Sequence, residues 1–136
     1  MFRLSIVTPE KVFYDAEVKS LTAPGTEGYL GILSHHAPLI TGLKPGKIEF
    51  RDAQDQVHVL AASGGFLEVS HNVATLLADA VENAAEIDIA RAQRAYELNK
   101  QRLISAGKGE ITIDLPACRA AMERASNRIK IYKDTH

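Results

Sequence analysis

The side chains best suited to bind a ligand are three arginines in the C-terminal part of the chain. Arg91 follows Asp88 by three residues, and Arg124 and Arg128 are four residues apart. On helices, these spacings place the members of each pair on one face. If two such helices pack antiparallel, the three guanidinium groups converge, with Asp88 and Glu82 nearby. Guanidinium groups fork onto phosphate oxygens, so the cluster suits a polyphosphate. A solvated face with ordinary charge pairs is the alternative that spacing alone leaves open.

Other candidate motifs predict no catalytic site. Glycines at 25, 28 and 31 resemble a phosphate-binding loop, but no Gly-Lys-Ser/Thr ending and no amphipathic helix follow them. We interpret them as turn glycines. His35 and His36 are adjacent, so on an extended backbone they point to opposite faces and cannot easily share a metal. No nucleophile lies in a recognisable catalytic motif, so we predict a protein that binds partners and is not itself an enzyme.

Bulk composition narrows the class of protein. The chain has 136 residues, of which 46% are hydrophobic and 24% charged, and its formal net charge is -1. This composition is typical of a globular protein, and a sequence-independent nucleic-acid binder would need a clear basic excess. The single cysteine, Cys118, allows no disulfide within the chain. We expect a soluble protein without a signal peptide or membrane-spanning segment, and any membrane association to come through a partner.

Residues 1–83 follow the pattern of short strands. Apolar side chains alternate with polar ones, and turn residues separate the runs. No helix-length apolar period lies between them, so we predict a flattened antiparallel β-sandwich rather than a parallel sheet. The expected strands lie at 2–6, 18–23, 48–50, 57–59, 66–69 and 73–78.

Residues 84–136 change to the helical period. Two apolar stripes with alternating spacings of three and four residues predict two helices that pack as an antiparallel hairpin. The first helix should open at Ile87-Asp88 and end at Gly107 and Gly109, and Asp114 should cap the second. A narrow seam leaves little apolar surface for other contacts, so both a detachable and a permanently docked hairpin stay open. The stripes are Ala85, Ile89, Ala92, Tyr96, Asn99 and Leu103, then Leu115, Cys118, Met122, Ala125, Ile129 and Tyr132.

Several motifs, in order and over nearly the whole chain, resemble the epsilon subunit of the bacterial F-type ATP synthase. Ile87-Asp88-x-x-Arg91-Ala92 is similar to the start of that family's C-terminal hairpin. The other matching segments are 7–10, 25–33, 36–40, 43–46, 63–69 and 77–80.

The resemblance implies a non-catalytic rotor subunit of a proton- or sodium-driven ATP synthase. Its sandwich would lie against the gamma subunit and the c-subunit ring, with Tyr29, His36 and Pro38 as rotor-interface residues. Its mobile hairpin would extend to the beta subunits and inhibit ATP hydrolysis. The complex would lie on the cytoplasmic face of the bacterial plasma membrane. No metal or cofactor is required, and ATP is a regulatory ligand in some relatives. The residues that would bind it are Glu82, Ile87, Asp88, Arg91, Ala92, Arg124 and Arg128.

Three positions depart from the family pattern. Ser34-His35 replaces Pro-Gly before the family's histidine, and Tyr29 stands where an acidic residue is frequent. Ser70-His71-Asn72 replaces a turn that contains Pro-Gly. Two alternative functions accompany the rotor role: a protein that acts primarily as an ATP sensor, which requires the arginines to converge, and an unrelated small hydrolase, which requires a nucleophile and base in contact.

Overall fold

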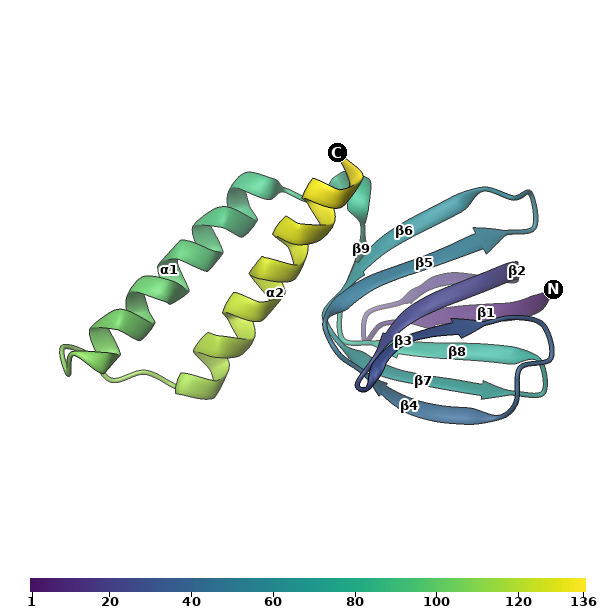
Figure 1. The fold of residues 1–136 in the computed structure, drawn as a ribbon, viewed down its shortest axis with the longest axis horizontal. Coiled ribbons are helices and arrows are strands. Elements are labelled where there is room, and N and C mark those ends of the chain that lie inside the picture. The colour runs from purple at the N-terminus through teal and green to yellow at the C-terminus, as the bar shows by residue number, and fades with distance from the viewer. The chain divides into compact units, whose positions relative to one another are not determined.

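The computed structural model describes all 136 residues, which divide into two compact units, Met1–Asn83 and Ala84–His136. The first unit is formed by nine strands and the second by helices (Figure 1). The strands are β1 Phe2–Val7, β2 Val12–Gly25, β3 Gly28–Ile32, β4 Leu39–Leu43, β5 Gly46–Asp52, β6 Val57–Ala62, β7 Gly65–Ser70, β8 Val73–Ala78 and β9 Val81–Asn83.

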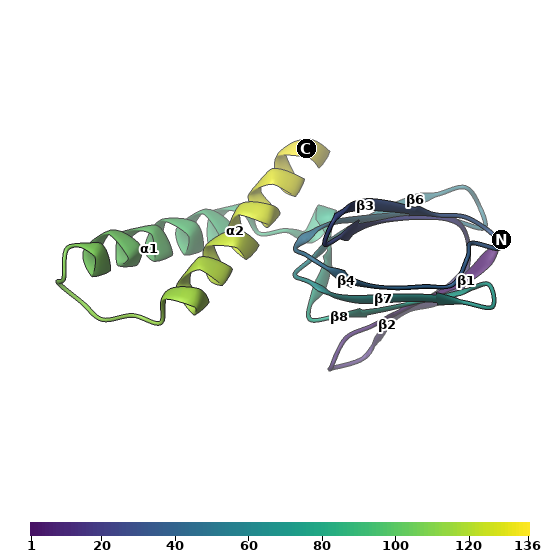
Figure 2. The same cartoon turned by 60° about the horizontal axis from the view of Figure 1, so that its bottom comes forward.

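The β unit is a flattened barrel made of two layers, and Figure 2 looks into its end. One layer has the order β1-β8-β7-β4, and the other contains β2, β3, β5, β6 and β9. The 14-residue strand β2 joins the layers, because its first half pairs with β1 and its second half pairs with β5 and β3. The β1–β8 pair is parallel and every other pair is antiparallel.

Alternation along the strands builds the barrel's core. Leu4 and Ile6 of β1, Ile48 of β5 and Leu76 of β8 are completely enclosed. Each such side chain contributes roughly 1.5–3 kcal/mol when it leaves water. The outward positions between them stay in contact with solvent, so each strand has one buried and one exposed face.

The predicted fold class, a β-sandwich followed by a helical hairpin, is confirmed. Three strands were missed: β3, β4 and β9. The prediction of turn glycines is correct for Gly25 and Gly28, which pair across a two-residue hairpin turn, but wrong for Gly31, which lies within strand β3. The parallel β1–β8 pair was also not expected, because it joins segments about seventy residues apart in a chain whose neighbouring strands mostly form hairpins.

The helical unit begins with a short 3-10 helix, η1 Ala84–Glu86, followed by α1 Ile89–Gly107 and α2 Leu115–Thr135. Asp88 is the N-cap of α1 and Asp114 is the N-cap of α2. The prediction that the first helix opens at Ile87 was therefore two residues too early. Each aspartate accepts a backbone N–H of the first turn, which otherwise has no partner within the helix. Neither α1 nor α2 is both long and apolar enough to cross a membrane.

α1 and α2 pack against each other along the predicted seam. Ala92, Cys118 and Ala125 are buried, and the Cys118 thiol donates to the backbone oxygen of Asn99 at 3.3 Å. Each stripe was wrong at its first residue, since Ala85 and Leu115 are exposed. Ala85 lies in η1, before the helical period starts, and Leu115 lies in the first turn of α2.

Candidate functional site

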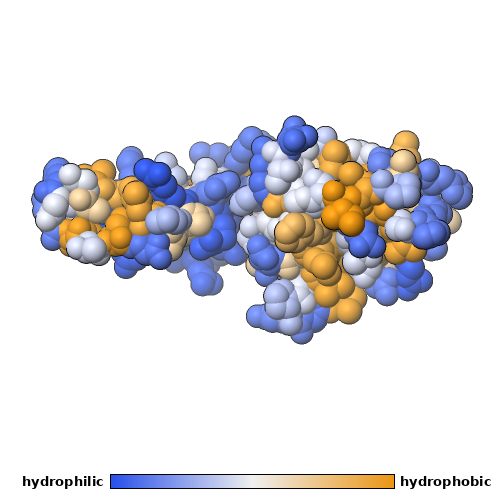
Figure 3. Space-filling view, turned by 90° about the horizontal axis from the view of Figure 1, so that it is seen from below, coloured by the Kyte–Doolittle hydropathy of each residue, from blue (hydrophilic) through white to orange (hydrophobic).

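An apolar surface lies on the outer face of β4, β7 and β8. Phe66 of β7 pairs with Leu77 of β8, and both are more than half exposed, at 62% and 51%. Ile40 of β4, in the neighbouring row of the sheet, is 75% exposed. We call Ile40, Phe66 and Leu77 the apolar face. Seen from the β4 side, apolar side chains gather over the β unit (orange in Figure 3).

The row beside Phe66 and Leu77 is more polar. Ile40 pairs with Glu68, which in turn pairs with Thr75. An apolar centre with polar neighbours is typical of a surface that another protein covers. Single exposed apolar residues are ordinary on a protein surface, but three of them on adjacent strands form a patch that calls for an explanation. Sequence reasoning did not identify this face, although the outward apolar positions of strands 66–69 and 73–78 were a usable signal.

The predicted rotor-interface residues occupy one strand and the loop that follows it. Tyr29 lies on β3 and is 56% exposed, but its hydroxyl accepts the backbone N–H of Lys47 at 3.1 Å. His36 is half-buried, with Nδ1 2.7 Å from the oxygen of Ala37, and Pro38 is exposed. The Tyr29 hydroxyl therefore helps to hold the fold together, while its ring is exposed to solvent.

The seam of the hairpin determines the side on which the arginines lie. Ala92 of α1 and Ala125 of α2 are both buried in the helical unit. Arg91 and Arg124 each precede one of these alanines, and in antiparallel helices the positions before two facing residues lie on the same side. Arg128, three residues after Ala125, is on that side too. Arg91 and Arg124 are exposed, and Arg128 is half-buried.

The other predicted nucleotide-binding residues have different surroundings. The Asp88 carboxylate accepts the backbone N–H of Arg91 at 3.0 Å, so Asp88 meets Arg91 through the main chain rather than through a side-chain pair on one helical face. Ile87 and Ala92 are buried, at 6% and 2% exposure. Glu82 belongs to β9 of the β unit, whereas the remaining six candidates belong to the helical unit.

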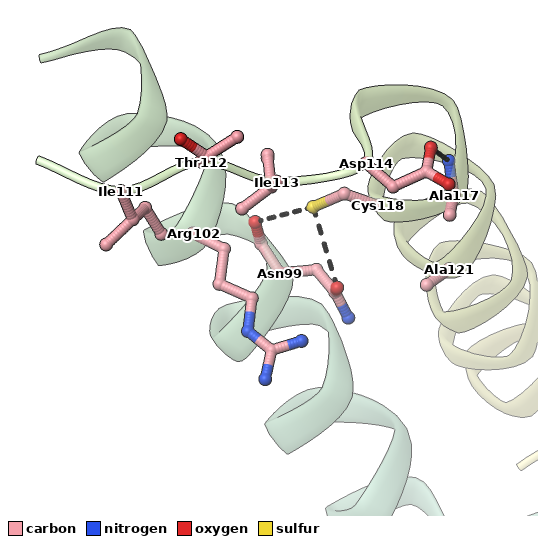
Figure 4. A pocket seen from close by; sticks show the side chains of 9 residues that line it. All are labelled: Asn99, Arg102, Ile111, Thr112, Ile113, Asp114, Ala117, Cys118 and Ala121. Carbon is pink, nitrogen blue, oxygen red and sulfur yellow. Dashed lines mark hydrogen bonds between the residues drawn. The ribbon is translucent and has the colours of Figure 1, made fainter. Parts of the chain in front are cut away.

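A cavity of about 600 Å³ lies elsewhere in the helical unit, between the helices and the segment that connects them. None of the three candidate arginines lines it, and its cationic residue is Arg102 (Figure 4). The Cys118 thiol lies between the backbone and side-chain oxygens of Asn99. Asn99 was visible in the sequence as the one polar interruption of the first stripe. The residues that line the cavity are Asn99, Arg102, Ile111, Thr112, Ile113, Asp114, Ala117, Cys118 and Ala121.

One carboxylate and histidine are in direct contact. His58 Nε2 donates to Asp52 Oδ2 at 2.8 Å, and the His58 ring stacks on Phe50 with 4.5 Å between centroids. The hydrogen bond from His58 holds the pKa of Asp52 below its usual value, aided by the backbone N–H groups of Gln54 and Gln56. The partners of His58 are thus a carboxylate and an aromatic ring, an arrangement that closes the β5–β6 turn and contains no nucleophile.

Comparisons with known proteins cover both units. Residues 1–84 match the family model described as the beta-sandwich domain of the ATP synthase delta/epsilon chain, and residues 85–133 match its long alpha-helix domain. The ATP synthase epsilon chain of Desulforamulus reducens is 44% identical over 128 residues, which are 94% of each chain. That of Moorella thermoacetica is 42% identical, over 93% of this chain and 92% of the relative.

Solved structures agree on the fold. A chain in the cryo-EM structure of the Euglena gracilis mitochondrial ATP synthase, OSCP/F1/c-ring in rotational state 1, aligns with a TM-score of 0.69. The alignment covers 97% of this chain and 77% of that one, at 19% sequence identity.

Proposed function

The chain belongs to the ATP synthase delta/epsilon family, and we propose that it is a rotor subunit that couples the gamma subunit to the c-subunit ring and inhibits ATP hydrolysis. In this role it performs no chemistry itself. It would lie at the periphery of the complex, on the cytoplasmic face of the bacterial plasma membrane. The observation that carries the coupling role is the apolar face of β4, β7 and β8, which in isolation is exposed to water.

The β unit provides the docking surfaces in this proposal. The apolar face would bind the gamma subunit, because burying Phe66 and Leu77 releases the free energy that their exposure costs. The exposed Tyr29 ring and the loop that carries His36 and Pro38 would contact the c-subunit ring.

The helical unit provides the inhibitory element. Between residues 84 and 136, ten lysines and arginines outnumber seven aspartates and glutamates, although the whole chain is slightly acidic. A basic hairpin suits acidic segments of the beta subunits, since complementary charges favour and orient association. When the hairpin extends and contacts them, it would block rotation in the hydrolysis direction.

Removing the hairpin tests this role. A chain that ends at Asn83 keeps the first compact unit and should assemble with the other subunits, while ATP hydrolysis by the reconstituted complex rises several-fold above that with the full chain. The rise follows because the inhibited state loses the contacts that populate it. The measurement is steady-state phosphate release by complexes of matched subunit content. An assembled complex whose hydrolysis stays at the full-chain rate would contradict the inhibitory role.

A second function, ATP sensing, has support from the hairpin itself. The sensor is supported by helix geometry, by which Arg91, Arg124 and Arg128 would share one side of the seam, and by the exposure of Arg91 and Arg124. Three guanidinium groups on one side can hold a triphosphate through charge-assisted hydrogen bonds. ATP bound there would stabilise the closed hairpin and so oppose its extension, by as much as its affinities for the two states differ.

Calorimetric titration of the full chain with ATP tests the sensor. We expect saturable binding that Arg91→Ala and Arg124→Ala each weaken by at least about tenfold, the effect of losing one hydrogen bond to a charged group. Asp88→Ser tests the Asp88 charge separately from its cap, since serine retains the cap but not the charge. Asp88→Ala would confound the result, because it also removes the cap. No heat of binding at millimolar ATP would eliminate the sensor and leave the rotor role in place.

A further inference from the structure

Three segments of the β unit meet at one side-chain amide, that of Asn72 in the turn between β7 and β8. Its Oδ1 accepts the backbone N–H of His35 at 2.7 Å. Its Nδ2 donates to the backbone oxygen of Met1 at 3.0 Å. The backbone oxygen of Asn72 also accepts the N–H of Arg3 at 3.2 Å. One residue therefore connects the start of β1, the β7–β8 turn and the loop between β3 and β4.

The loop that Asn72 reaches has little else to hold it. Residues 33–38 join β3 to β4 and belong to no strand. Their other hydrogen bonds, from His36 N–H to the oxygen of Leu33 and between the His36 ring and Ala37, are internal to the loop. The bond from His35 to Asn72 is the one that ties the loop to another segment. His35 has a φ of 60°, a left-handed conformation that residues with a side chain adopt infrequently.

Asparagine meets each requirement of this position. Residue 72 has a φ of 62°, which asparagine adopts more readily than most residues with a side chain. Its amide supplies an acceptor for His35 and a donor for Met1 at once. Aspartate would keep only the acceptor, and glycine would keep only the backbone conformation.

We propose that Asn72 is a positioning residue that holds loop 33–38 in the conformation required for binding the rotor. The inference rests on the proposed function, which makes His36 and Pro38 of this loop contacts to the c-subunit ring. A loop that is already ordered loses little conformational entropy on binding. Preorganisation by Asn72 therefore increases affinity without any direct contact between Asn72 and the partner.

The structural part is tested on the isolated full chain with Asn72→Gly. Glycine tolerates the left-handed backbone, so this variant removes the two side-chain bonds without adding strain. We expect backbone order parameters of residues 33–37 to fall from about 0.85 to below about 0.6. Asn72→Asp, which retains the acceptor, should restore the order. His71→Gly is the matched control, because His71 shares the turn and has a φ of 50° but the hydrogen bond of its ring is to the adjacent Ser70. A loop that stays rigid in Asn72→Gly would overturn the proposal.

The functional part uses binding to a complex of the gamma subunit and the c-subunit ring from the same ATP synthase. Asn72→Gly should weaken binding roughly three- to tenfold, the factor that one neutral hydrogen bond corresponds to. In a background that carries both His36→Ala and Pro38→Ala it should have no further effect, because Asn72 acts through the loop. Additive losses would overturn the positioning role. If His36→Ala and Pro38→Ala together leave the affinity unchanged, the loop is no rotor contact and the positioning role fails, whereas docking through the apolar face is tested separately at Phe66.

Discussion

Replacing Phe66 by glutamate should prevent the chain from assembling with the gamma subunit while the chain itself stays folded. Phe66 is 62% exposed on the outer face of β7, so the isolated β unit can place a glutamate there in water. Once the face is covered, the same carboxylate would be buried without a partner, which is costly. A central aromatic anchor of an interface typically contributes about 2 kcal/mol or more, so the affinity should fall at least about thirtyfold.

Surface plasmon resonance with immobilised gamma subunit measures this effect, and thermal unfolding checks the fold. Val57→Glu is the matched control, because Val57 of β6 is an exposed apolar strand residue, at 50%, in the other layer of the barrel. It should bind nearly as the unchanged chain does. Equal losses in both variants would indicate a general effect of negative charge and would remove the apolar face from the docking proposal.

Replacing the neighbouring residue, Gly65, by alanine should destabilise the fold itself, in contrast to the change at Phe66. A Cβ at Gly65 would lie 1.9 Å from the backbone oxygen of Leu77 and 2.9 Å from the Cα of Ala78. Its φ of 141° is also a conformation that side chains rarely adopt. Because both obstacles are main-chain, no rotamer change relieves them, and β7 must separate from β8. We expect Gly65→Ala to lower the free energy of unfolding by about 3 kcal/mol or more.

Urea denaturation followed by circular dichroism measures this loss. Gly31→Ala in β3 is the matched control, since a Cβ there meets nothing within 4 Å. Its free energy of unfolding should change by no more than about 0.5 kcal/mol. A Gly65→Ala midpoint that coincides with that of Gly31→Ala would mean that β7 and β8 can separate locally without cost.

Much of the fold could be predicted because it depends on short-range patterns. Strand alternation at 2–6 and 66–69 and the stripes through Ala92 and Ala125 each reflect one face of one element meeting a core. The cap at Asp114 and the end at Gly107 depend on backbone groups within one helical turn. For the same reason, the change from the strand period to the helical period near residue 84 could be predicted from the sequence alone.

Parts of the candidate site could be predicted less well. That Arg91, Arg124 and Arg128 share one side stays a prediction from the seam, because helical geometry converts spacing into direction. The spacing of Asp88 and Arg91 was misleading, since it does not show whether Asp88 lies within the helix or caps it. That choice is made by the backbone conformation at residue 88, where φ is -82° and ψ is 93°.

The sequence by itself determined the order and type of the main elements and the family to which the chain belongs. It also predicts an organisation in two parts. The tertiary structure alone decided which distant segments meet: the parallel pairing of β1 with β8, the division of β2 between two layers, and the convergence of Met1 and His35 on Asn72. The physical reason is that a local pattern reports which face of a segment avoids water. The partner that covers this face is chosen by packing and by hydrogen bonds between residues that are far apart in the chain.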